Sequence, residues 1–297
     1  MRKLFLFLIL GIILINSGAC TTRIIDDSKL NIAVSIVPQE TFVKAVGGDL
    51  VDVITMIPPG YSPANYQPTP MQIIDFSEAD LYLSIGVPAE KANILPKAAE
   101  LNKNIKIVPL ADKVSAVYSH HIISESGHNE ENHTHIERDP HIWLSPKRVM
   151  VMIDVIKDEL ILLDPDNKSI YEKNAANYIA QLKSVDKEIV EILKGLNQKS
   201  FIIYHPAFGY FADDYGLKMV TIEENGKETT VKQIQTVIDF AKKENIKVIF
   251  YQEEFDGHQA EIIAKEIGGA TVQVAPLSPN YIDNLISIAN TFKQVLH

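Results

Sequence analysis

Cysteine is nearly absent from this sequence, which has Cys20 and no other cysteine among its 297 residues. No disulfide can therefore form within the chain, and a hydrophobic core must stabilise the fold. Basic residues are also few, because 28 lysines and arginines stand against 38 aspartates and glutamates, a formal net charge of −10. The sequence has no basic patch with interleaved aromatic residues either. These absences argue against nucleic acid as a partner and favour solubility or the attraction of cations.

Signatures of the common enzyme sites are missing as well. The chain has no His-Glu-x-x-His motif, no Gly-x-Ser-x-Gly nucleophile elbow and no phosphate loop of the Gly-Lys-Ser/Thr type. The glycine pairs at 47–48 and 268–269 follow predicted helices and are typical of helix C-caps. A secreted zinc hydrolase would need an open metal site with a general base, and the sequence shows no substrate-pocket signature for one. We therefore predict that the protein is not an enzyme.

The apolar run at residues 4–15 is too short to span a membrane. Two basic residues precede it and small residues lead from it to Cys20, which is the order of an export signal. We predict a signal peptide over residues 1–19, lipid attachment at Cys20 and a polar tether over residues 20–29. The protein would then be extracytoplasmic, at the cell surface or in the periplasm, and anchored to the membrane. An ordinary buried thiol is the alternative for Cys20.

Apolar runs bounded by turn residues alternate with helical patterns along the chain. This alternation predicts β-α units and mainly parallel sheets. The runs form two groups, so we predict an α/β fold with an N-terminal lobe over residues 30–145 and a C-terminal lobe over residues 198–297. The predicted strands are residues 32–37, 51–57, 81–85 and 105–109 in the first lobe and 201–204, 219–222, 248–251 and 272–275 in the second.

The longest helical pattern lies between the two groups of strands. It begins at Ser145-Pro146, a serine cap followed by proline at the first helical position, and it predicts a linker helix over residues 146–197. Its second part carries apolar residues at steps of three and four. The tripeptide Asp164-Pro165-Asp166 would kink or break it. A stiff helical linker makes a large closing motion of the lobes less expected than in proteins with loop hinges.

Histidines are concentrated in one part of the chain, since six of the nine fall between residues 120 and 141. They are mixed with carboxylates, and imidazole with carboxylate is the ligand set that divalent transition metals prefer. Residues 118–139 have little apolar content and no period, so we predict a mobile histidine-rich loop. It would collect metal weakly and pass it on, with an inert solvated loop as the alternative. The loop histidines are His120, His121, His128, His133 and His135.

Two histidines lie where the predicted backbone is fixed. His141 follows Asp139-Pro140 and stands directly before the capped start of the linker helix. His205 follows the predicted strand at 201–204, and ligands of α/β sheets bind at the carboxyl ends of strands. We predict that His141 and His205 are metal ligands, against the alternative of structural histidines that are merely hydrogen-bonded. His258 and His297 are predicted to be surface residues.

The motifs around these histidines resemble a known family: the metal-binding lipoproteins of ABC importers for zinc, manganese and iron, also called cluster A-I or zinc-uptake solute-binding proteins. The resemblance rests on Asp-Pro-His-Ile-Trp at 139–143 and His-Pro-Ala-Phe-Gly-Tyr at 205–210, in this order around a histidine-rich insertion, and covers most of the chain. It implies two Rossmann-like lobes joined by a single long α-helix, with a metal cleft between them. It also implies delivery of the metal to a membrane permease with its ATPase.

The same resemblance implies that His141 and His205 are two of four family ligands, but the other two positions differ. Alanine stands at both, as Ala64 after Ser-Pro and as Ala275 before Pro-Leu. Two ligands are too few for zinc, which takes three or four from the protein. The candidates for the remainder are water and the side chains of Gln252, Glu253, Glu254, Glu223, Glu224, His133 and His135. Among these we prefer Glu253.

The leading hypothesis is an extracytoplasmic solute-binding protein of an ABC importer that captures Zn²⁺ and delivers it to the permease. Nitrogen ligands favour Zn²⁺ as the transported ion, with Mn²⁺ or Fe²⁺ as alternatives. A second hypothesis keeps the fold and binds a chelated metal, or acts as a metal-dependent surface adhesin or regulator. We expect a monomer, whose partners are the metal ion, the permease and its ATPase.

Overall fold

The computed structural model describes residues 28–123, 137–223 and 229–297 of the chain. The predicted signal peptide, the lipidation candidate Cys20 and residues 20–27 of the predicted tether lie outside these ranges. So do Glu224 and most of the predicted histidine-rich loop, including His128, His133 and His135. Within the described ranges, no helix is both long and apolar enough to cross a membrane.

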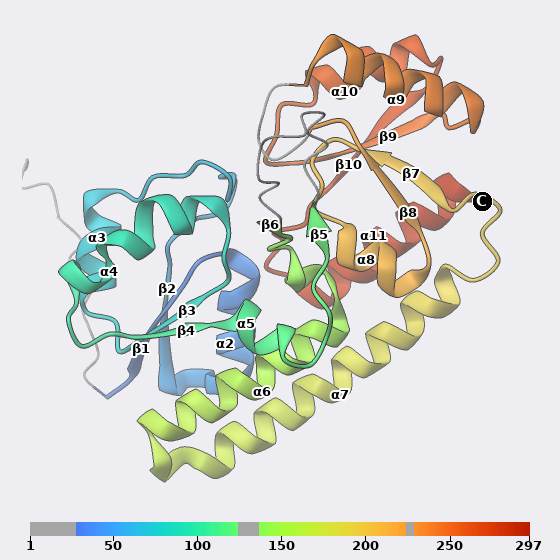
Figure 1. The fold of residues 1–297 in the computed structure, drawn as a ribbon. Helices are drawn as coiled ribbons and strands as arrows, with labels where there is room; N and C mark the ends of the chain where they lie inside the picture. The colour runs from blue at the N-terminus through green and yellow to red at the C-terminus, as the bar shows by residue number, and fades with distance from the viewer. Residues whose placement is uncertain (1–27, 124–136, 224–228) are drawn as a thin grey trace, which may run out of the picture.

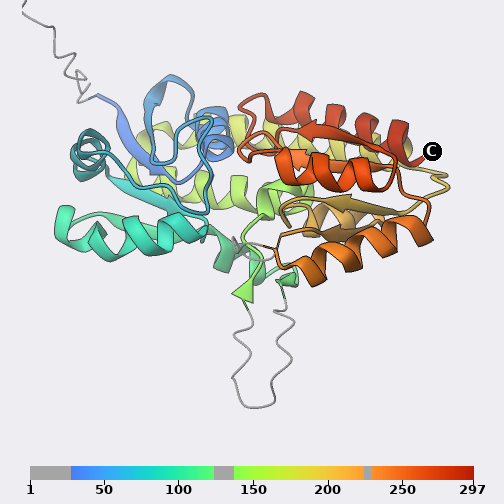
Figure 2. The ribbon, with the colours of Figure 1, turned by 90° about the horizontal axis from the view of Figure 1, so that it is seen from above.

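Two α/β lobes lie side by side in the structure (Figure 1, Figure 2). Each lobe contains a four-stranded sheet in which every described pairing is parallel. The eight strands overlap the eight predicted apolar runs, and the predicted fold class is confirmed. They are β1 (Leu30–Val34), β2 (Val51–Thr55), β3 (Leu81–Ser84) and β4 (Lys106–Pro109) in the first lobe, and β7 (Ser200–Ile203), β8 (Lys218–Thr221), β9 (Val248–Gln252) and β10 (Ala270–Val274) in the second.

The two sheets share one strand order. It is β2-β1-β3-β4 in the first lobe and, read from the other edge, β8-β7-β9-β10 in the second. In both lobes the second strand of the chain therefore lies on one side of the first strand, and the third strand lies on its other side. The crevice at the carboxyl ends of the two central strands is the topological switch point, where α/β sheets bind ligands. For the second lobe this crevice lies between the ends of β7 and β9.

Helices cover both faces of each sheet (Figure 1). Alternate strand residues point to opposite faces, so that Ile202 packs on one side of the second sheet and Phe201 on the other. The outer faces are covered by α3 (Pro70–Ser77) and α4 (Leu95–Leu101) in the first lobe and by α9 (Val231–Lys243) and α10 (His258–Glu266) in the second. The inner faces contact α2 (Val37–Gly47), α5 (Leu110–Ser115), α8 (Gly209–Tyr215) and α11 (Tyr281–Leu296).

The linker is divided where the sequence allowed a break. α6 (Pro146–Leu163) and α7 (Lys168–Ile192) pack against each other, and a 3-10 turn at Pro165–Asn167 separates them (Figure 1). Pro165 lacks an N–H for a helical hydrogen bond. The Asp164 carboxylate stabilises the turn by accepting hydrogen bonds from Asn167 Nδ2 and Tyr171 Oη, both at 2.7 Å. α7, with 25 residues and a length of roughly 37 Å, contacts α2 of the first lobe and α11 of the second and so joins them.

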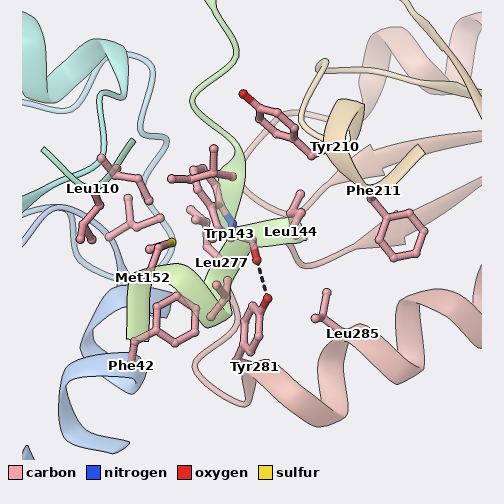
Figure 3. Close-up of a cluster of buried hydrophobic side chains, with 14 of the residues drawn as sticks. Phe42, Leu110, Trp143, Leu144, Met152, Tyr210, Phe211, Leu277, Tyr281 and Leu285 are labelled. Atoms are coloured by element: carbon pink, nitrogen blue, oxygen red, sulfur yellow. Dashed lines mark hydrogen bonds between the residues drawn. The ribbon is translucent and has the colours of Figure 1, made fainter. Parts of the chain in front are cut away.

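A single hydrophobic core continues from one lobe into the other, as Figure 3 shows. Trp143 lies at its centre, in the segment that leads into α6, and is buried. Its indole Nε1 donates a hydrogen bond to the carbonyl of Pro276 at 3.0 Å, and its own carbonyl accepts one from Tyr281 Oη at 2.6 Å. The Tyr281 ring in turn contacts Phe42 of α2 edge to face, at 4.8 Å between centroids. The segment that carries His141 is therefore packed between both lobes.

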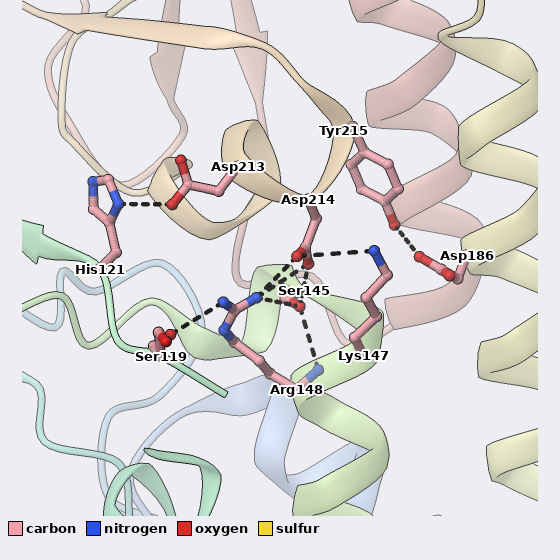
Figure 4. A network of polar contacts seen from close by, with 9 residues as sticks. All are labelled: Ser119, His121, Ser145, Lys147, Arg148, Asp186, Asp213, Asp214 and Tyr215. Atoms are coloured by element: carbon pink, nitrogen blue, oxygen red, sulfur yellow. Dashed lines mark hydrogen bonds and ion pairs between the residues drawn. The ribbon is translucent and has the colours of Figure 1, made fainter. Parts of the chain in front are cut away.

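A buried ion pair fixes the start of α6 to the second lobe (Figure 4). The guanidinium of Arg148 donates from Nη1 to both carboxylate oxygens of Asp214 in α8, at 3.1 and 3.2 Å, and the two side chains are only 8% and 11% exposed. Ser145, whose hydroxyl caps α6, donates to the same carboxylate at 2.5 Å. The Arg148 guanidinium also lies over the Tyr210 ring, 4.3 Å from its centroid. This network holds the helix start four residues after His141 against α8.

Replacing Arg148 by glutamine should destabilise the protein, because Asp214 would keep a mostly buried charge without its main partner. We expect the free energy of unfolding to fall by about 3 kcal/mol in R148Q, measured by chemical denaturation. The matched control is K194Q, which breaks the pair of Lys194 with Glu191, where both side chains are at least 70% exposed. It should cost less than about 0.5 kcal/mol. Equal losses in the two variants would contradict a structural role for the buried pair.

Candidate metal centre

His141 is held by the aspartate two residues before it. The Asp139 side chain is fully buried, and its Oδ1 accepts hydrogen bonds from the backbone N–H of His141 at 2.9 Å and from the ring Nδ1 at 2.6 Å. The backbone of Asp139 is fixed as well, because its carbonyl accepts a hydrogen bond from Tyr210 Oη and its N–H donates to the carbonyl of His121. The imidazole therefore has one orientation, with Nε2 directed away from Asp139.

His205 is held in the same way from the second lobe. It follows β7, and its Nδ1 lies 2.6 Å from Oε2 of Glu223, a buried residue just after β8. Gln252, at the end of β9, fixes the backbone by accepting from the His205 N–H and donating to its carbonyl. The ring of Phe255 stacks on the imidazole, at 4.8 Å between centroids and 23° between planes. His205 thus lies at the switch point of the second sheet.

The two imidazoles face each other between the lobes, with 3.2 Å between His141 Nε2 and His205 Nε2. A carboxylate accepts a hydrogen bond, so each Nδ1 beside its carboxylate is a donor, and a ring whose single proton is on Nδ1 presents an Nε2 lone pair to the other ring. Opposed lone pairs repel unless a cation lies between them. Two nitrogens bound to one tetrahedral zinc ion at 2.0–2.1 Å lie about 3.3 Å apart. The spacing of the pair therefore fits two ligands of one metal ion.

Burial favours the neutral form of His205. Desolvation lowers the pKa of its ring below the ordinary value, while the hydrogen bond to Glu223 opposes this shift and the neighbouring His141 adds to it. A neutral imidazole is the form that binds a metal. The carboxylate behind each ring both fixes the tautomer and makes Nε2 a better electron donor. The pair is thus prepared for a cation without any change of side-chain conformation.

The histidine pair opens into a cavity of about 670 Å³ between the lobes. Its wall includes the loop at residues 60–65 of the first lobe and residues that follow β7 and β9 in the second. Ala64, one of the two positions where the resemblance placed a ligand, lines this cavity with its methyl group. Among the described residues, no group of three or more histidine, cysteine, aspartate or glutamate side chains is placed to hold a metal ion. The described residues therefore present two candidate ligands, His141 and His205.

The tentative ligand Glu253 lies outside this cavity. Its side chain is exposed, its backbone N–H bonds the carbonyl of Val274, and the described cavity wall contains Glu254 in its place. The preference for Glu253 assumed the alternation of a strand. However, β9 ends at Gln252 and the chain turns there, so alternation no longer decides which side chain faces inward.

The other predicted positions have separate places. His121 is not at the cavity, and its Nδ1 pairs with Asp213 of α8 at 2.9 Å (Figure 4). His120 is exposed, as are His258 at the start of α10 and His297 at the chain end. Asp139 and Glu223 were not predicted as the groups that orient the rings, although Glu223 was a candidate ligand. Asp139 could have been found from its place two residues before His141, but no sequence pattern pairs Glu223 with His205.

Comparison with known proteins agrees with this geometry. The model of the family described as "Zinc-uptake complex component A periplasmic" matches residues 32–295. The zinc-binding lipoprotein AdcA of Streptococcus pneumoniae strain ATCC BAA-255 / R6 is 34% identical over 267 residues, which cover 87% of this chain and 52% of AdcA. The high-affinity zinc uptake system protein ZnuA of Bacillus subtilis strain 168 is 33% identical, with coverage of 82% and 77%. This chain thus spans about half the length of the streptococcal AdcA proteins and more of the Bacillus protein.

A solved structure shows the same arrangement of the lobes. The crystal structure of a ZnuA protein superimposes on this chain with a TM-score of 0.80 at 34% sequence identity, and the match covers 91% of this chain and all of the other. The two α/β lobes and their helical connection are therefore common to both proteins.

Glu254 should make the stability of the metal-free protein depend on pH. Burial raises the pKa of its carboxyl group from the ordinary 4.5 to about 7, and its Oε1 has no hydrogen-bond partner among the described residues. The folded protein then binds a proton that the unfolded chain has released, so stability is lost as the pH rises from about 4.5 to about 7. Glutamine removes this titration. We expect E254Q to match the original protein at pH 5 and to melt roughly 2–4 °C higher at pH 8.

The exposed neighbour provides the control for this comparison. E253Q removes the same charge one residue earlier, and since the Glu253 charge adds to the raised pKa of Glu254, this variant should raise the melting temperature at pH 8 by clearly less than E254Q does. Differential scanning calorimetry in the presence of a metal chelator measures all three proteins. The assignment fails if E254Q shows the same difference from the original protein at pH 5 and at pH 8.

Proposed function

The chain belongs to the family of periplasmic zinc-uptake components, and on that premise we propose that it is an extracytoplasmic solute-binding protein of an ABC importer. It captures Zn²⁺ between its lobes and delivers the ion to the membrane permease, which works with its own ATPase. The supporting observation is the pair of imidazoles, His141 buried and His205 partly buried, whose Nε2 atoms face each other at 3.2 Å, each held by a buried carboxylate. No catalytic step is part of this role.

His141 and His205 are the proposed metal ligands, and they come from different parts of the fold. His141 belongs to the segment before α6, and His205 follows β7 of the second lobe. An ion bound by both would therefore join the two sides of the cleft. Two imidazole nitrogens favour Zn²⁺ over Mn²⁺, which prefers oxygen ligands, with Fe²⁺ between them in the order of affinities.

We also propose how the protein is attached to the membrane and that it acts as a single copy. Lipidation of Cys20 would anchor the protein outside the cytoplasm, next to its permease, and the protein would act as a monomer. Both the permease and the ATPase are proposed partners on the strength of family membership. An acidic chain with a net charge of −10 also attracts cations toward its surface.

Removing either imidazole should nearly abolish tight binding of zinc. We expect H141A and H205A each to weaken the affinity for Zn²⁺ by about 100-fold or more, which equals roughly 2.7 kcal/mol. Isothermal titration calorimetry measures this, and H258A is the control because His258 is an exposed histidine on the surface of the second lobe. Binding of Zn²⁺ no tighter than about 10 µM by the original protein would overturn the proposal. The same titration with Mn²⁺ and Fe²⁺ ranks the metals.

Glu223 should act on zinc affinity through His205. In E223Q the amide can donate to Nδ1 as well as accept from it, so the proton of the ring is no longer confined to Nδ1 and Nε2 is a weaker ligand. We expect the affinity for Zn²⁺ to fall by about 10-fold to 100-fold. E261Q, a neutralised exposed glutamate on α10, is the control for lost charge. An unchanged zinc affinity in E223Q would show that the carboxylate is not needed to orient the ring.

A further inference from the structure

The described residues place fewer donor atoms at the histidine pair than a zinc ion binds. Tetrahedral zinc binds four ligands, and the two nitrogens provide two. The nearest carboxylates are occupied, because Asp139 Oδ1 and Glu223 Oε2 each bind an Nδ1. The second oxygen of Asp139 lies on the side of Gly209, where a Cβ atom would come within 2.7 Å of it. Within the described part of the chain, no third protein donor is placed at the pair.

The space beside the pair is much larger than two water ligands need. Two water molecules occupy about 60 Å³ in the liquid, whereas the cavity measures about 670 Å³. Cavities of roughly 300–1,000 Å³ are typical of sites for small organic molecules. The methyl group of Ala64 on the wall adds to the room and supplies no ligand. The size of the cavity therefore indicates a cargo that is larger than a bare ion.

The cavity wall has the composition of an organic-ligand site. Aromatic rings contribute flat apolar surface, with Phe255 stacked on His205 and Tyr204 tilted against Phe255 at 5.7 Å between centroids. Tyr61 and the amide side chains of Asn65 and Gln259 add hydrogen-bonding groups. The wall thus combines apolar surface with polar groups, among them the carboxyl groups of Glu223, Glu254 and Asp256. Apolar walls that carry polar groups bind and orient small molecules.

An arginine is also among the residues of this wall. Arg138 lines the cavity from β6 (Glu137–Arg138), three residues before His141. It contacts Asp112 at 2.7 Å and Ser115 at 3.2 Å, both through Nη1. A guanidinium has five N–H donors, so it can hold a carboxylate of a ligand in addition to these contacts. Arg138 therefore lines the same cavity as the two proposed metal ligands.

We infer that the cargo is zinc bound to a small organic chelator that carries a carboxylate. His141 and His205 supply two nitrogens, the chelator supplies the remaining ligands, its carboxylate pairs with Arg138, and its body lies against the aromatic wall. This inference rests on the proposed function, because it specifies the form in which the same site takes zinc. The competing arrangement completes the coordination without a chelator, by water molecules or by candidate side chains outside the described residues, namely His133, His135 and Glu224.

The two arrangements predict opposite effects of an added chelator. A chelator that only competes lowers the free zinc and weakens apparent binding, whereas one that joins the complex strengthens it. The probes are Zn²⁺ alone, Zn²⁺ with an equimolar amount of L-histidine, Zn²⁺ with an equimolar amount of citrate, and each chelator without metal. Trp143 is the only tryptophan of the chain, and its ring lies 5.1 Å from that of His141, so its fluorescence reports binding at the pair.

We expect at least one of the two chelators to tighten the apparent affinity for zinc by about tenfold or more. Equilibrium dialysis with the isotope-labelled compound should then find one chelator retained per zinc ion by the full chain, and none without zinc. H141A should lose this retention, which separates the pair from other histidines that bind zinc. R138Q should lower retention of the chelator by about tenfold, while D112N, which removes the partner of Arg138 and keeps the guanidinium, should not.

The outcomes separate this inference from the proposed function. If Zn²⁺ alone binds tightly at the pair and both chelators weaken it without being retained, the chelator inference is overturned and zinc capture stands. If neither Zn²⁺ nor any zinc–chelator mixture binds more tightly than about 10 µM, both are overturned. Retention of a chelator that is unaffected in R138Q would overturn the assignment of Arg138.

Discussion

Two imidazole rings meet between the lobes, each backed by a buried carboxylate, and the rest of the site follows from this contact. Asp139 is fully buried and Glu223 is 3% exposed, so two carboxyl groups are enclosed behind the two rings. Buried charge is costly unless it is compensated. One proton shared by the two Nε2 atoms would cancel the charge of one ionised carboxylate, whereas a divalent cation cancels the charges of two. The geometry of the rings and the charge behind them therefore both favour a divalent metal over a proton.

The contact between the two imidazoles requires that the lobes keep their relative position. A metal ion tolerates displacements of its donor atoms of only about 0.2 Å. Three features provide this rigidity. The hydrophobic core is continuous across the lobes around Trp143, α7 packs on helices of both lobes, and Arg148 ties the start of α6 to Asp214. Closely packed interiors transmit displacement and resist it. The site thus depends on packing far from the metal, which is why a histidine placed just before α6 can meet one placed after β7.

Part of the fold and part of the candidate site were predictable from the sequence, because they depend on local patterns. Strands of parallel sheets appear as short apolar runs bounded by turn residues, so all eight strands of the two sheets could be located, including the more exposed edge strands such as β4. The capped start of α6 at Ser145-Pro146 was equally visible, because capping is a local property. His141 and His205 were candidates since each follows a fixed backbone segment, and their roles as ligands remain a prediction. The division of the linker at Pro165 was visible only as a possibility, because a proline inside a helical pattern either kinks the helix or ends it.

The parts that could not be predicted depend on distant segments of the chain. Glu223 and His205 are 18 residues apart and meet because β7 and β8 are neighbours in the sheet. Glu254 faces the cavity and Glu253 does not, because the chain turns immediately after β9. Neither fact has a local signature. The size of the cavity could not be predicted either, since it results from how the two lobes are packed.

The repeated strand order raises the question of why only one lobe offers a ligand at its switch point. In the first lobe the corresponding crevice, at the ends of β1 and β3, is filled by Glu90, whose Oε2 accepts hydrogen bonds from Ser35 Oγ and from the N–H groups of Ile85 and Gly86. A carboxylate of the protein thus occupies the donors that a ligand would use.

An amide bridges the central strands in both lobes, but with different consequences. Gln39 accepts from the N–H groups of Ser35 and Ile36 and donates to the carbonyl of Leu83, as Gln252 bridges to both backbone groups of His205 in the second lobe. In the second lobe this bridge leaves the imidazole pointing into the cleft. The first lobe, whose crevice is closed by Glu90, instead provides its imidazole from the segment that leaves the lobe toward α6. The asymmetry of the metal centre is therefore a consequence of one repeated fold in which one of two equivalent crevices is filled by the protein itself.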